Sequence, residues 1–596
     1  MSKINEQKNY TLSFEESESV SKKSGSAKSA FKKMLPLLLL EKRGVITAFI
    51  ATLLTSALIL TGPLLIGYAI DTYIVQDNYD GVLRIGLVLF AIYVAAFISN
   101  YIQMVIMGGV AQRVLWNLRN DLFMKLQELP LSFFNQNKSG DLISRINSDT
   151  EKVNEFFSQG LMRFAGNVFL ILGAGIFIFS INFTLAAVSL IPAIFILLFT
   201  KIISGWVTRR NKKSLTEGGL LSAEIQESIT NFKVILAFNR RDYFKNQFKK
   251  INTRNYKASF DAEIANEIFT PIFEFLGNVA MIIMLAYGLY LVSTGQFAIG
   301  LLVSFVIYIT RFYDPLREMA RLWASLQSAL AAWDRIGGIL NFTSDMEVVP
   351  VSDTKKTGKG LLEFRNVSFS YLQGKSVLEN NSFVLEEGKT YALVGPTGGG
   401  KTTTASLIAR LYDPTEGTVF LDGADLRTYS PKERTSRIGF ILQEPYLFTG
   451  TIKENLIYGS EKLSLLSDVD FKTEITEKGF TTLLNRFKDG LATEISDTNN
   501  LSLGEKQIIA FMRAVLREPN ILVLDEATAN IDTVTEDVLE TIIKKLPKTT
   551  TKIIIAHRLN TIKDADTIFF VNGMKITEAG SMEQAVEMIL HGKRNS

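Results

Sequence analysis

The first half of the chain contains four long stretches that are apolar and carry no charged residue. They cover residues 44–70, 85–112, 164–200 and 275–310. A helix needs about 20 apolar residues to cross a bilayer, so the first two stretches suit one span each. The last two are too long for one span and favour two helices each, with turns near 182–184 and 293–296. The pattern therefore predicts six membrane spans, because buried helices of a soluble protein do not need such long charge-free runs.

Basic residues are distributed unequally between the connecting segments. Residues 113–163 carry seven Lys and Arg and residues 201–274 carry thirteen, whereas the connector 71–84 carries only Arg84 and the two turns carry none. Loops rich in Lys and Arg stay on the cytoplasmic side of a membrane. We therefore expect a multi-pass protein of the cell membrane, with the long loops and both the N- and C-termini cytoplasmic.

The composition suggests four segments and excludes several chemistries. Residues 1–27 are polar and predict a disordered tail, 28–340 a transmembrane domain, 341–360 a linker and 361–596 a second domain. The tail lacks the apolar core of a secretory signal. The net charge of +4 gives no indication of a nucleic-acid partner. The absence of cysteine excludes disulfides, thiolate metal sites and cysteine nucleophiles.

The second half of the chain contains a glycine-rich loop between an apolar strand at 391–394 and a helix predicted at 403–411. The loop matches the pattern G-x-x-x-x-G-K-[ST] and predicts an α/β domain that binds ATP and Mg²⁺. Its backbone N–H groups would surround phosphate oxygens, Lys401 would reach the β- and γ-phosphates, and the Thr402 hydroxyl would hold Mg²⁺. The predicted nucleotide-binding residues of this segment are Gly395, Pro396, Thr397, Gly398, Gly399, Gly400, Lys401, Thr402 and Thr403.

Two further apolar strands end in residues that suit phosphate chemistry. The strand 521–524 ends in Asp525 and Glu526. Asp525 suits a Mg²⁺ ligand, and Glu526 suits the base that orients or deprotonates the attacking water. His557 follows the strand 552–556. A single histidine at a strand end is more often structural, but its position after the acidic pair favours contact with the γ-phosphate.

Four shorter motifs accompany these residues, and together they resemble the ATP-binding-cassette (ABC) ATPases. Residues 501–507, LSLGEKQ, resemble the family's L-S-G-G-Q signature, and residues 529–532 resemble its D-loop. The resemblance implies that Ser502, Gly504 and Asp532 contact nucleotide. It also implies that Gln443 is a Q-loop residue with a catalytic and metal-binding role. Tyr371, before the first nucleotide-binding strand, resembles the aromatic residue that stacks on adenine, although a tyrosine there can equally belong to the core.

Six spans ahead of one ATPase domain resemble an ABC exporter of type IV, present as a half-transporter. In this family two halves form a dimer that binds each ATP between the phosphate loop of one cassette and the signature of the other. Residues 133–149 and 225–238 resemble the two cytoplasmic loops whose short coupling helices dock on the ATPase domains. Ordinary amphipathic loops are the alternative. Pro130 and Gly140 are expected to break the helix that carries the first loop.

The signature of this chain departs from the family pattern at two positions. Leu503 replaces the first glycine and Glu505 replaces the glutamine. A leucine side chain adds bulk and a glutamate adds negative charge where the partner's γ-phosphate would lie. Because the phosphate loop and acidic pair are intact, we expect one half of a heterodimer whose partner supplies an intact signature. A homodimer that tolerates the changes is the alternative.

The substrate is less well defined by the sequence. Few charged residues lie inside the spans, and those near the ends of the last two are Glu267, Glu274, Arg311, Asp314 and Arg317. A mainly apolar cavity would suit amphipathic drugs or membrane lipids, although the same residues suit ordinary helix packing. The expected function is ATP-driven export by alternating access. The alternatives are a homodimeric lipid flippase, an ATP-gated channel or regulatory subunit with little transport, and, less favoured, an importer.

Overall fold

The computed structural model forms two compact units. Among the described residues, one comprises those from 36 to 126 together with 140–341, and the other comprises 127–139 together with those from 342 onward. The residues described by the structure are 36, 39–344, 346, 348–350, 358–371, 374–496, 501–525, 533–555, 565–579, 583–584 and 587–588.

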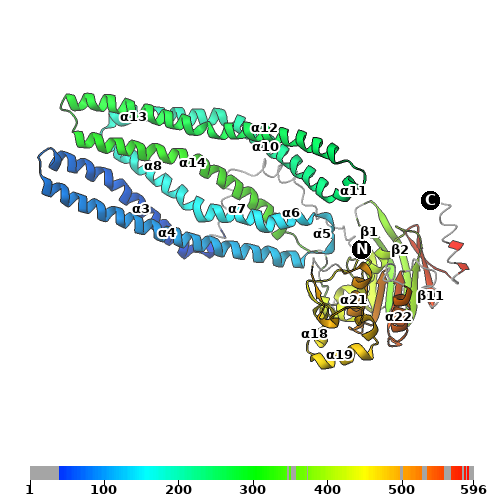
Figure 1. Ribbon diagram of the computed structural model, residues 1–596. Helices are drawn as coiled ribbons and strands as arrows, with labels where there is room; N and C mark the ends of the chain where they lie inside the picture. Colours follow the sequence, from blue (N-terminus) through cyan, green and yellow to red (C-terminus); the bar gives the residue numbers. More distant parts are fainter. Residues whose placement is uncertain are drawn as a thin grey trace. The chain divides into compact units, whose positions relative to one another are not determined.

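The first unit is entirely helical in its described part (Figure 1). Six of its helical segments are long and apolar enough to cross a membrane: Lys42–Ile74, Tyr79–Glu128, Ser139–Ile181, Phe183–Thr230, Arg241–Ser293 and Ile299–Leu340. The six predicted spans are therefore confirmed, as are the turns after Ile181 and Ser293. The elements are α3 (Lys42–Ala69), η1 (Ile70–Ile74), α4 (Tyr79–Glu128), α6 (Ser139–Ser144), η2 (Arg145–Asp149), α7 (Thr150–Glu155), η3 (Phe156–Gly160), α8 (Leu161–Ile181), α9 (Phe183–Ser189), α10 (Ile191–Thr230), α11 (Phe232–Ala237), α12 (Arg241–Glu267), α13 (Phe269–Ser293) and α14 (Ile299–Leu340).

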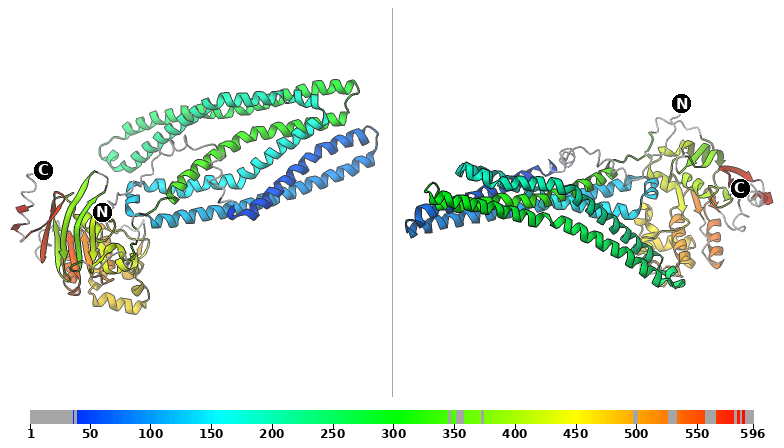
Figure 2. Two further views of the ribbon diagram at one scale, coloured as in Figure 1. Left: turned by 180° about the vertical axis from the view of Figure 1, so that it is seen from behind. Right: turned by 90° about the horizontal axis from the view of Figure 1, so that it is seen from above.

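Helix α14 is the central packing element of the helical unit, in contact with α3, α8 and α13. Figure 2 shows α12 and α13 following each other end to end, with α10 running beside them along one side of this unit. Hydrogen bonds to backbone carbonyls join α14 to α3: the Tyr308 hydroxyl donates to Leu60 at 2.5 Å and Ser304 to Pro63 at 2.7 Å. Such bonds satisfy polar groups that lipid cannot. The α3–α14 pair is consequently held by directed contacts as well as by packing.

Two pairs of long helical segments are joined by short helices: α5 (Leu131–Gln136) lies between α4 and α6, and α11 lies between α10 and α12. We call each pair, with its joining helix, a hairpin. Pro130 precedes α5, and Asn231 precedes α11. The predicted break at Pro130 is confirmed, because the chain there is extended and proline cannot continue the preceding helix. The break expected at Gly140 is wrong, because Asn137 is the extended residue and α6 already begins at Ser139. Glycine is tolerated in a first helical turn, where its lack of side chain costs little.

The second unit contains a parallel sheet flanked by helices, which confirms the α/β prediction. The strand order is β12-β11-β3-β10-β9-β6, with only β12 antiparallel, and a second, antiparallel sheet has the order β2-β1-β4-β5. The strands are β1 (Leu362–Ser370), β2 (Ser376–Leu385), β3 (Thr390–Val394), β4 (Glu416–Leu421), β5 (Ala424–Asp425), β6 (Ile438–Ile441), β7 (Gly450–Thr451), β8 (Glu494–Ile495), β9 (Ile521–Asp525), β10 (Thr551–Ile555), β11 (Thr567–Asn572) and β12 (Lys575–Ala579). The helices are α15 (Lys401–Ile408), η5 (Leu426–Thr428), α16 (Pro431–Arg437), α17 (Ile452–Ile457), α18 (Glu461–Ser464), α19 (Asp468–Glu477), α20 (Thr481–Leu484), η6 (Gly490–Ala492), α21 (Leu503–Val515) and α22 (Thr533–Lys544).

Two predicted helices differ from the observed ones at their ends. The helix expected at 403–411 is α15, which ends at Ile408 because Arg410 adopts a left-handed backbone with φ of 49°. The helix expected at 508–516 is α21, which begins earlier, at Leu503, because Ser502 caps it. The signature-like residues therefore form the first turn of a helix.

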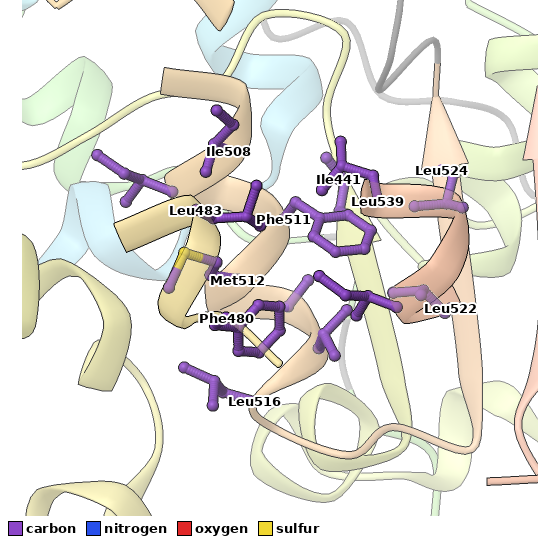
Figure 3. Close-up of a cluster of buried hydrophobic side chains, with 14 of the residues drawn as sticks. Ile441, Phe480, Leu483, Ile508, Phe511, Met512, Leu516, Leu522, Leu524 and Leu539 are labelled. Carbon is purple, nitrogen blue, oxygen red and sulfur yellow. The ribbon is translucent and has the colours of Figure 1, made fainter. Parts of the chain in front are cut away.

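Helix α21 is anchored by a cluster of buried apolar side chains, which Figure 3 shows. Ile508, Phe511 and Met512 of the helix are each no more than 2% exposed, and they belong to the same buried cluster as Leu522 and Leu524 of β9. Burying one such side chain stabilises a fold by about 1.5–3 kcal/mol relative to leaving it in water. This packing anchors the signature helix in the core of the second unit, where it contacts α17 and β6.

Candidate nucleotide site

The loop after β3 has the backbone that phosphate binding requires. Gly395, Gly398 and Gly400 have φ values of 145°, 81° and 111°, which side-chain-bearing residues rarely adopt. A Cβ atom on Gly395 would lie 2.2 Å from the carbonyl oxygen of Val571 in β11, and one on Gly399 would lie 2.5 Å from the same oxygen. The glycines therefore allow the loop to turn tightly against β11 at the N-terminus of α15.

Lys401 is held inside this loop. Its side chain is buried, and its Nζ donates hydrogen bonds to the carbonyls of Gly395 at 2.8 Å and Pro396 at 3.0 Å. Thr402 is exposed beside it, and the first turn of α15 contains no acidic residue. The Lys401 ammonium group and the positive N-terminal end of α15 therefore lie at the same loop. Together they suit the binding of negatively charged phosphate oxygens.

The sheet brings the proposed metal-binding residues to the same edge. In the parallel register Ile441 of β6 pairs with Leu524 of β9, and Asp525 pairs with Ile555 of β10, whose other neighbour is β3. Asp525 and the residues that follow β3 and β6, including Gln443, thus lie at the carboxyl ends of neighbouring strands. Glu526, Asp532 and His557 lie outside the described residues.

These residues fit a magnesium ion chemically. Thr402 offers a hydroxyl, Asp525 a carboxylate and Gln443 an amide oxygen, and Mg²⁺ prefers oxygen ligands of this kind. Asp525 is only 1% exposed, and burial of a carboxylate favours a nearby cation. Thr402, Asp525 and Gln443 are accordingly the side chains that would hold the ion.

Tyr371 directly follows β1 and presents a partly exposed ring. Phe369 and Tyr412 contact the ring edge-on, with centroid distances of 4.8 Å and 5.2 Å and interplanar angles near 90°. The Tyr371 hydroxyl shares a hydrogen bond of 3.0 Å with Thr403 of α15. Burial raises the pKa of Tyr371, so the phenol stays neutral at physiological pH. Tyr371 is 39% exposed, and its ring is supported by neighbouring side chains, which suits stacking on a planar base.

Comparison with known proteins agrees with this geometry. A family model of the ABC transporter transmembrane region matches residues 45–316, and an ABC transporter model matches residues 378–529. The chain belongs to the ABC transporter family. It is therefore a multi-pass membrane protein with an ATP-binding domain, an ATP-hydrolysing transporter of the exporter type in which spans and ATPase are fused.

Several relatives resemble this ABC transporter over most of their length. An uncharacterized ABC transporter ATP-binding protein of Bacillus subtilis, YfiC, is 32% identical over 92% of this chain and 91% of its own. A fatty acid ABC transporter ATP-binding/permease protein of Mycobacterium tuberculosis is 33% identical over 82% of this chain and 77% of its own. An ATP-dependent lipid A-core flippase of Syntrophus aciditrophicus is 29% identical over 93% of this chain and 92% of its own.

The altered signature of this ABC transporter forms a capping box at the start of α21. The Glu505 carboxylate accepts hydrogen bonds from the Ser502 backbone N–H at 2.7 Å and from the Ser502 hydroxyl at 2.9 Å. In return, the Glu505 N–H donates to the Ser502 hydroxyl oxygen at 3.2 Å. Leu503 is 43% exposed beside the box, and Gly504 follows it in the first helical turn. A negative charge and an exposed leucine thus occupy the end of the helix that would meet a phosphate.

One contact that the sequence analysis missed reaches the Tyr371 cluster from the first hairpin. Asn135 of α5 donates from its Nδ2 to the Tyr412 hydroxyl at 2.5 Å, and Tyr412 is the residue whose ring abuts Tyr371. The neighbouring Phe133 is fully buried and packs edge-on against Phe342 at 5.6 Å. The only sequence signal was the aromatic, proline-led composition of residues 130–136. Helix α5 is thereby joined to the aromatic cluster by the hydrogen bond from Asn135.

Proposed function

We propose that this ABC transporter exports an amphipathic lipid or drug across the cell membrane by alternating access, as one half of a dimer. The observation that carries the proposal is the complete phosphate loop, with Lys401 held inside it, in a chain that also has six spans. Relatives named for fatty acid transport, multidrug resistance and lipid A-core flipping support this substrate class. The twenty basic residues of the two long loops support cytoplasmic N- and C-termini.

In the proposed ATPase cycle, some residues of the nucleotide site bind ATP and others take part in its hydrolysis. Tyr371 stacks on the adenine, and the loop N–H groups and Lys401 hold the phosphates. Mg²⁺, when bound, neutralises charge on the phosphate oxygens. Glu526 orients or deprotonates the attacking water, while Gln443 and His557 complete the surroundings of the γ-phosphate, as the family resemblance implies.

The proposed coupling between ATP and the spans uses the short helices at the hairpin ends. ATP binding closes two cassettes around the nucleotide and hydrolysis reopens them. The bond from Asn135 to Tyr412 gives α5 a direct connection to the cluster that holds Tyr371. Phe232 and Val234 of α11 are each 54% exposed, which suits a helix that docks on a second cassette.

For the dimer, we favour a heterodimer over a homodimer. The Glu505 carboxylate and the exposed Leu503 disfavour phosphate at this chain's signature, while its own phosphate loop is intact. A partner with an intact signature would complete the hydrolysing site. A homodimeric lipid flippase that tolerates the altered signature is the second candidate, supported by the flippase among the relatives.

Reconstitution into liposomes tests the proposal. The protein, alone and with a candidate partner half, is assayed for ATPase activity and for ATP-dependent movement of a fluorescent lipid between leaflets. Glu526→Gln should lower both rates by about 10²–10⁴-fold while leaving ATP bound, because it removes the proposed base. ATP-dependent ion conductance without lipid or drug flux would instead indicate a gated channel. Undiminished turnover in Glu526→Gln would contradict the assigned role.

A further inference from the structure

Two neighbouring threonines in the first turn of α15 differ sharply in exposure. Thr402 is exposed, whereas Thr403 is only 5% exposed. Within the described part of the chain, the Thr403 hydroxyl makes one hydrogen bond, the 3.0 Å bond that it shares with the Tyr371 hydroxyl. Thr402 is therefore open to a ligand, while the hydroxyl of Thr403 is already engaged by Tyr371.

The turn that follows α15 supports Tyr371 at a second point. Tyr412 lies in this turn and is 7% exposed, and its ring contacts that of Tyr371 at a centroid distance of 5.2 Å. The buried side chain of Arg410 holds the turn, because its Nε donates a hydrogen bond to the Asp413 carboxylate at 2.8 Å. Helix α15 and its C-terminal turn thus provide both the hydrogen bond of Tyr371 and one of its ring contacts.

The remaining ring contact comes from Phe369 of β1, whose side chain is fully buried in the same apolar cluster as Tyr412. Both contacts are nearly perpendicular, and no aromatic ring among the described residues lies parallel to that of Tyr371. These contacts restrain the ring, but neither acts on its hydroxyl. The hydroxyl end of the side chain is held by the bond to Thr403.

This bond joins the predicted adenine-stacking ring to the helix that begins at the phosphate loop. Thr403 follows Lys401 and Thr402 directly, at the N-terminus of α15. A ring fastened there keeps a constant separation from the groups that suit phosphate oxygens. A loose side chain must instead be ordered when the ligand binds, which weakens affinity by about threefold to tenfold.

We propose that Thr403 is a positioning residue for the nucleotide base, because its hydroxyl orients the Tyr371 ring for stacking on adenine. Thr403 acts through Tyr371 and not on the nucleotide itself. Base binding and phosphate binding then both depend on the first turn of α15. The inference rests on the proposed role of Tyr371, and it predicts that the tyrosine hydroxyl contributes to ATP affinity in addition to the ring.

Equilibrium binding of ATP and of tripolyphosphate, each with Mg²⁺, to the purified full-length chain tests the inference. Tripolyphosphate lacks the base and ribose, so the factor by which ATP binds more tightly measures what they add. Tyr371→Phe and Thr403→Val should each reduce that factor about threefold to tenfold, and should change tripolyphosphate affinity less than twofold. Thr403→Ser keeps the hydroxyl and should bind both ligands as the wild type does. Tyr371→Trp keeps a donor, the indole N–H, and should stay close to wild type.

Further variants show that the effect belongs to this bond. The double variant of Tyr371→Phe and Thr403→Val should lose no more affinity than either single variant, because both remove one shared interaction. Tyr429→Phe is the matched control: the Tyr429 hydroxyl, just after η5, donates to the Leu421 carbonyl at 2.8 Å, and its loss should leave both affinities unchanged. Lys401→Ala should weaken tripolyphosphate binding, which verifies that this probe occupies the phosphate loop. A thermal unfolding curve shows whether Thr403→Val remains folded, and if it does not, Thr403→Ala and Tyr371→Phe carry the test.

Three results would overturn the inference. Thr403→Val could weaken ATP and tripolyphosphate equally, which would show direct contact of Thr403 with phosphate. The losses of the two single variants could add in the double variant, or neither single variant could alter ATP affinity.

These failures are separate from failure of the proposed function. Unchanged ATP affinity in Tyr371→Ala would reject stacking itself, whereas a loss in Tyr371→Ala without any loss in Tyr371→Phe would keep stacking and reject the role of Thr403. The predicted binding pattern without ATP-driven movement of a substrate would keep the role of Thr403 and reject export.

Discussion

Replacing Glu505 by glutamine should raise ATP hydrolysis at the composite site that this chain's signature completes. In the native chain the carboxylate holds the Ser502 hydroxyl and N–H at the start of α21. The glutamine side-chain oxygen can accept the same two hydrogen bonds without a negative charge. The substitution therefore changes the electrostatics of the helix end and preserves its cap.

The two effects of this substitution differ in size. Removing a carboxylate from a helix N-terminus costs about 0.3–1 kcal/mol of stability. A carboxylate about 6 Å from a phosphate charge, at an effective dielectric constant of about 20, repels it by about 3 kcal/mol. Screening by solvent reduces that value, so we expect a gain of about tenfold to hundredfold in nucleotide affinity or turnover at this site. Adding Leu503→Gly removes the bulk as well, at a further cost of about 1 kcal/mol in helix propensity.

The assay is steady-state ATPase activity of the purified chain alone, with its association state measured in parallel. Wild-type protein should be a poor ATPase, and activity should rise in Glu505→Gln and further in the double variant wherever the chain self-associates. Glu433→Gln is the matched control: Glu433 forms the same capping box with Ser430 at the start of α16, away from the signature. Robust hydrolysis by the unmodified lone chain, unchanged in Glu505→Gln, would refute the reasoning and favour a tolerant homodimer.

Three further substitutions test the rest of the nucleotide site. Lys401→Ala should weaken ATP binding at least about tenfold in a nucleotide-displacement titration, because charge-assisted hydrogen bonds contribute about 1.5–3 kcal/mol; retained affinity would contradict the phosphate role. Tyr371→Ala should raise the ATP concentration needed for half-maximal activity, whereas Tyr371→Trp should leave it nearly unchanged. If tryptophan raises that concentration as much as alanine does, stacking on adenine is rejected. Asn135→Ala should lower lipid-stimulated ATPase activity while leaving basal ATPase activity within about twofold, because it removes one hydrogen bond to Tyr412. Tyr412→Phe should have the same effect, because it removes the same bond. An equal loss of stimulated and basal activity would argue against coupling through this bond.

Several elements of this protein could be predicted closely because their signals are local. The turns after Ile181 and Ser293 followed from the length limit of one membrane span. Strand β3, the glycines of the phosphate loop and Lys401 followed from a short motif whose backbone requirements only glycine meets. Helix ends were less well predicted, since the stop of α15 depends on the left-handed backbone at Arg410.

The sequence by itself determined the six spans, the ATPase domain and the residues that suit phosphate and magnesium, because hydrophobic length, charge and loop chemistry are carried by neighbouring residues. Only the tertiary structure decided which distant residues meet. The bond from Asn135 to Tyr412 joins residues 277 positions apart, and the ion pair of Arg163 with Glu318 joins α8 to α14. Such contacts depend on how helices and strands pack, which no local pattern of residues specifies, and the first of them supplies the proposal for coupling.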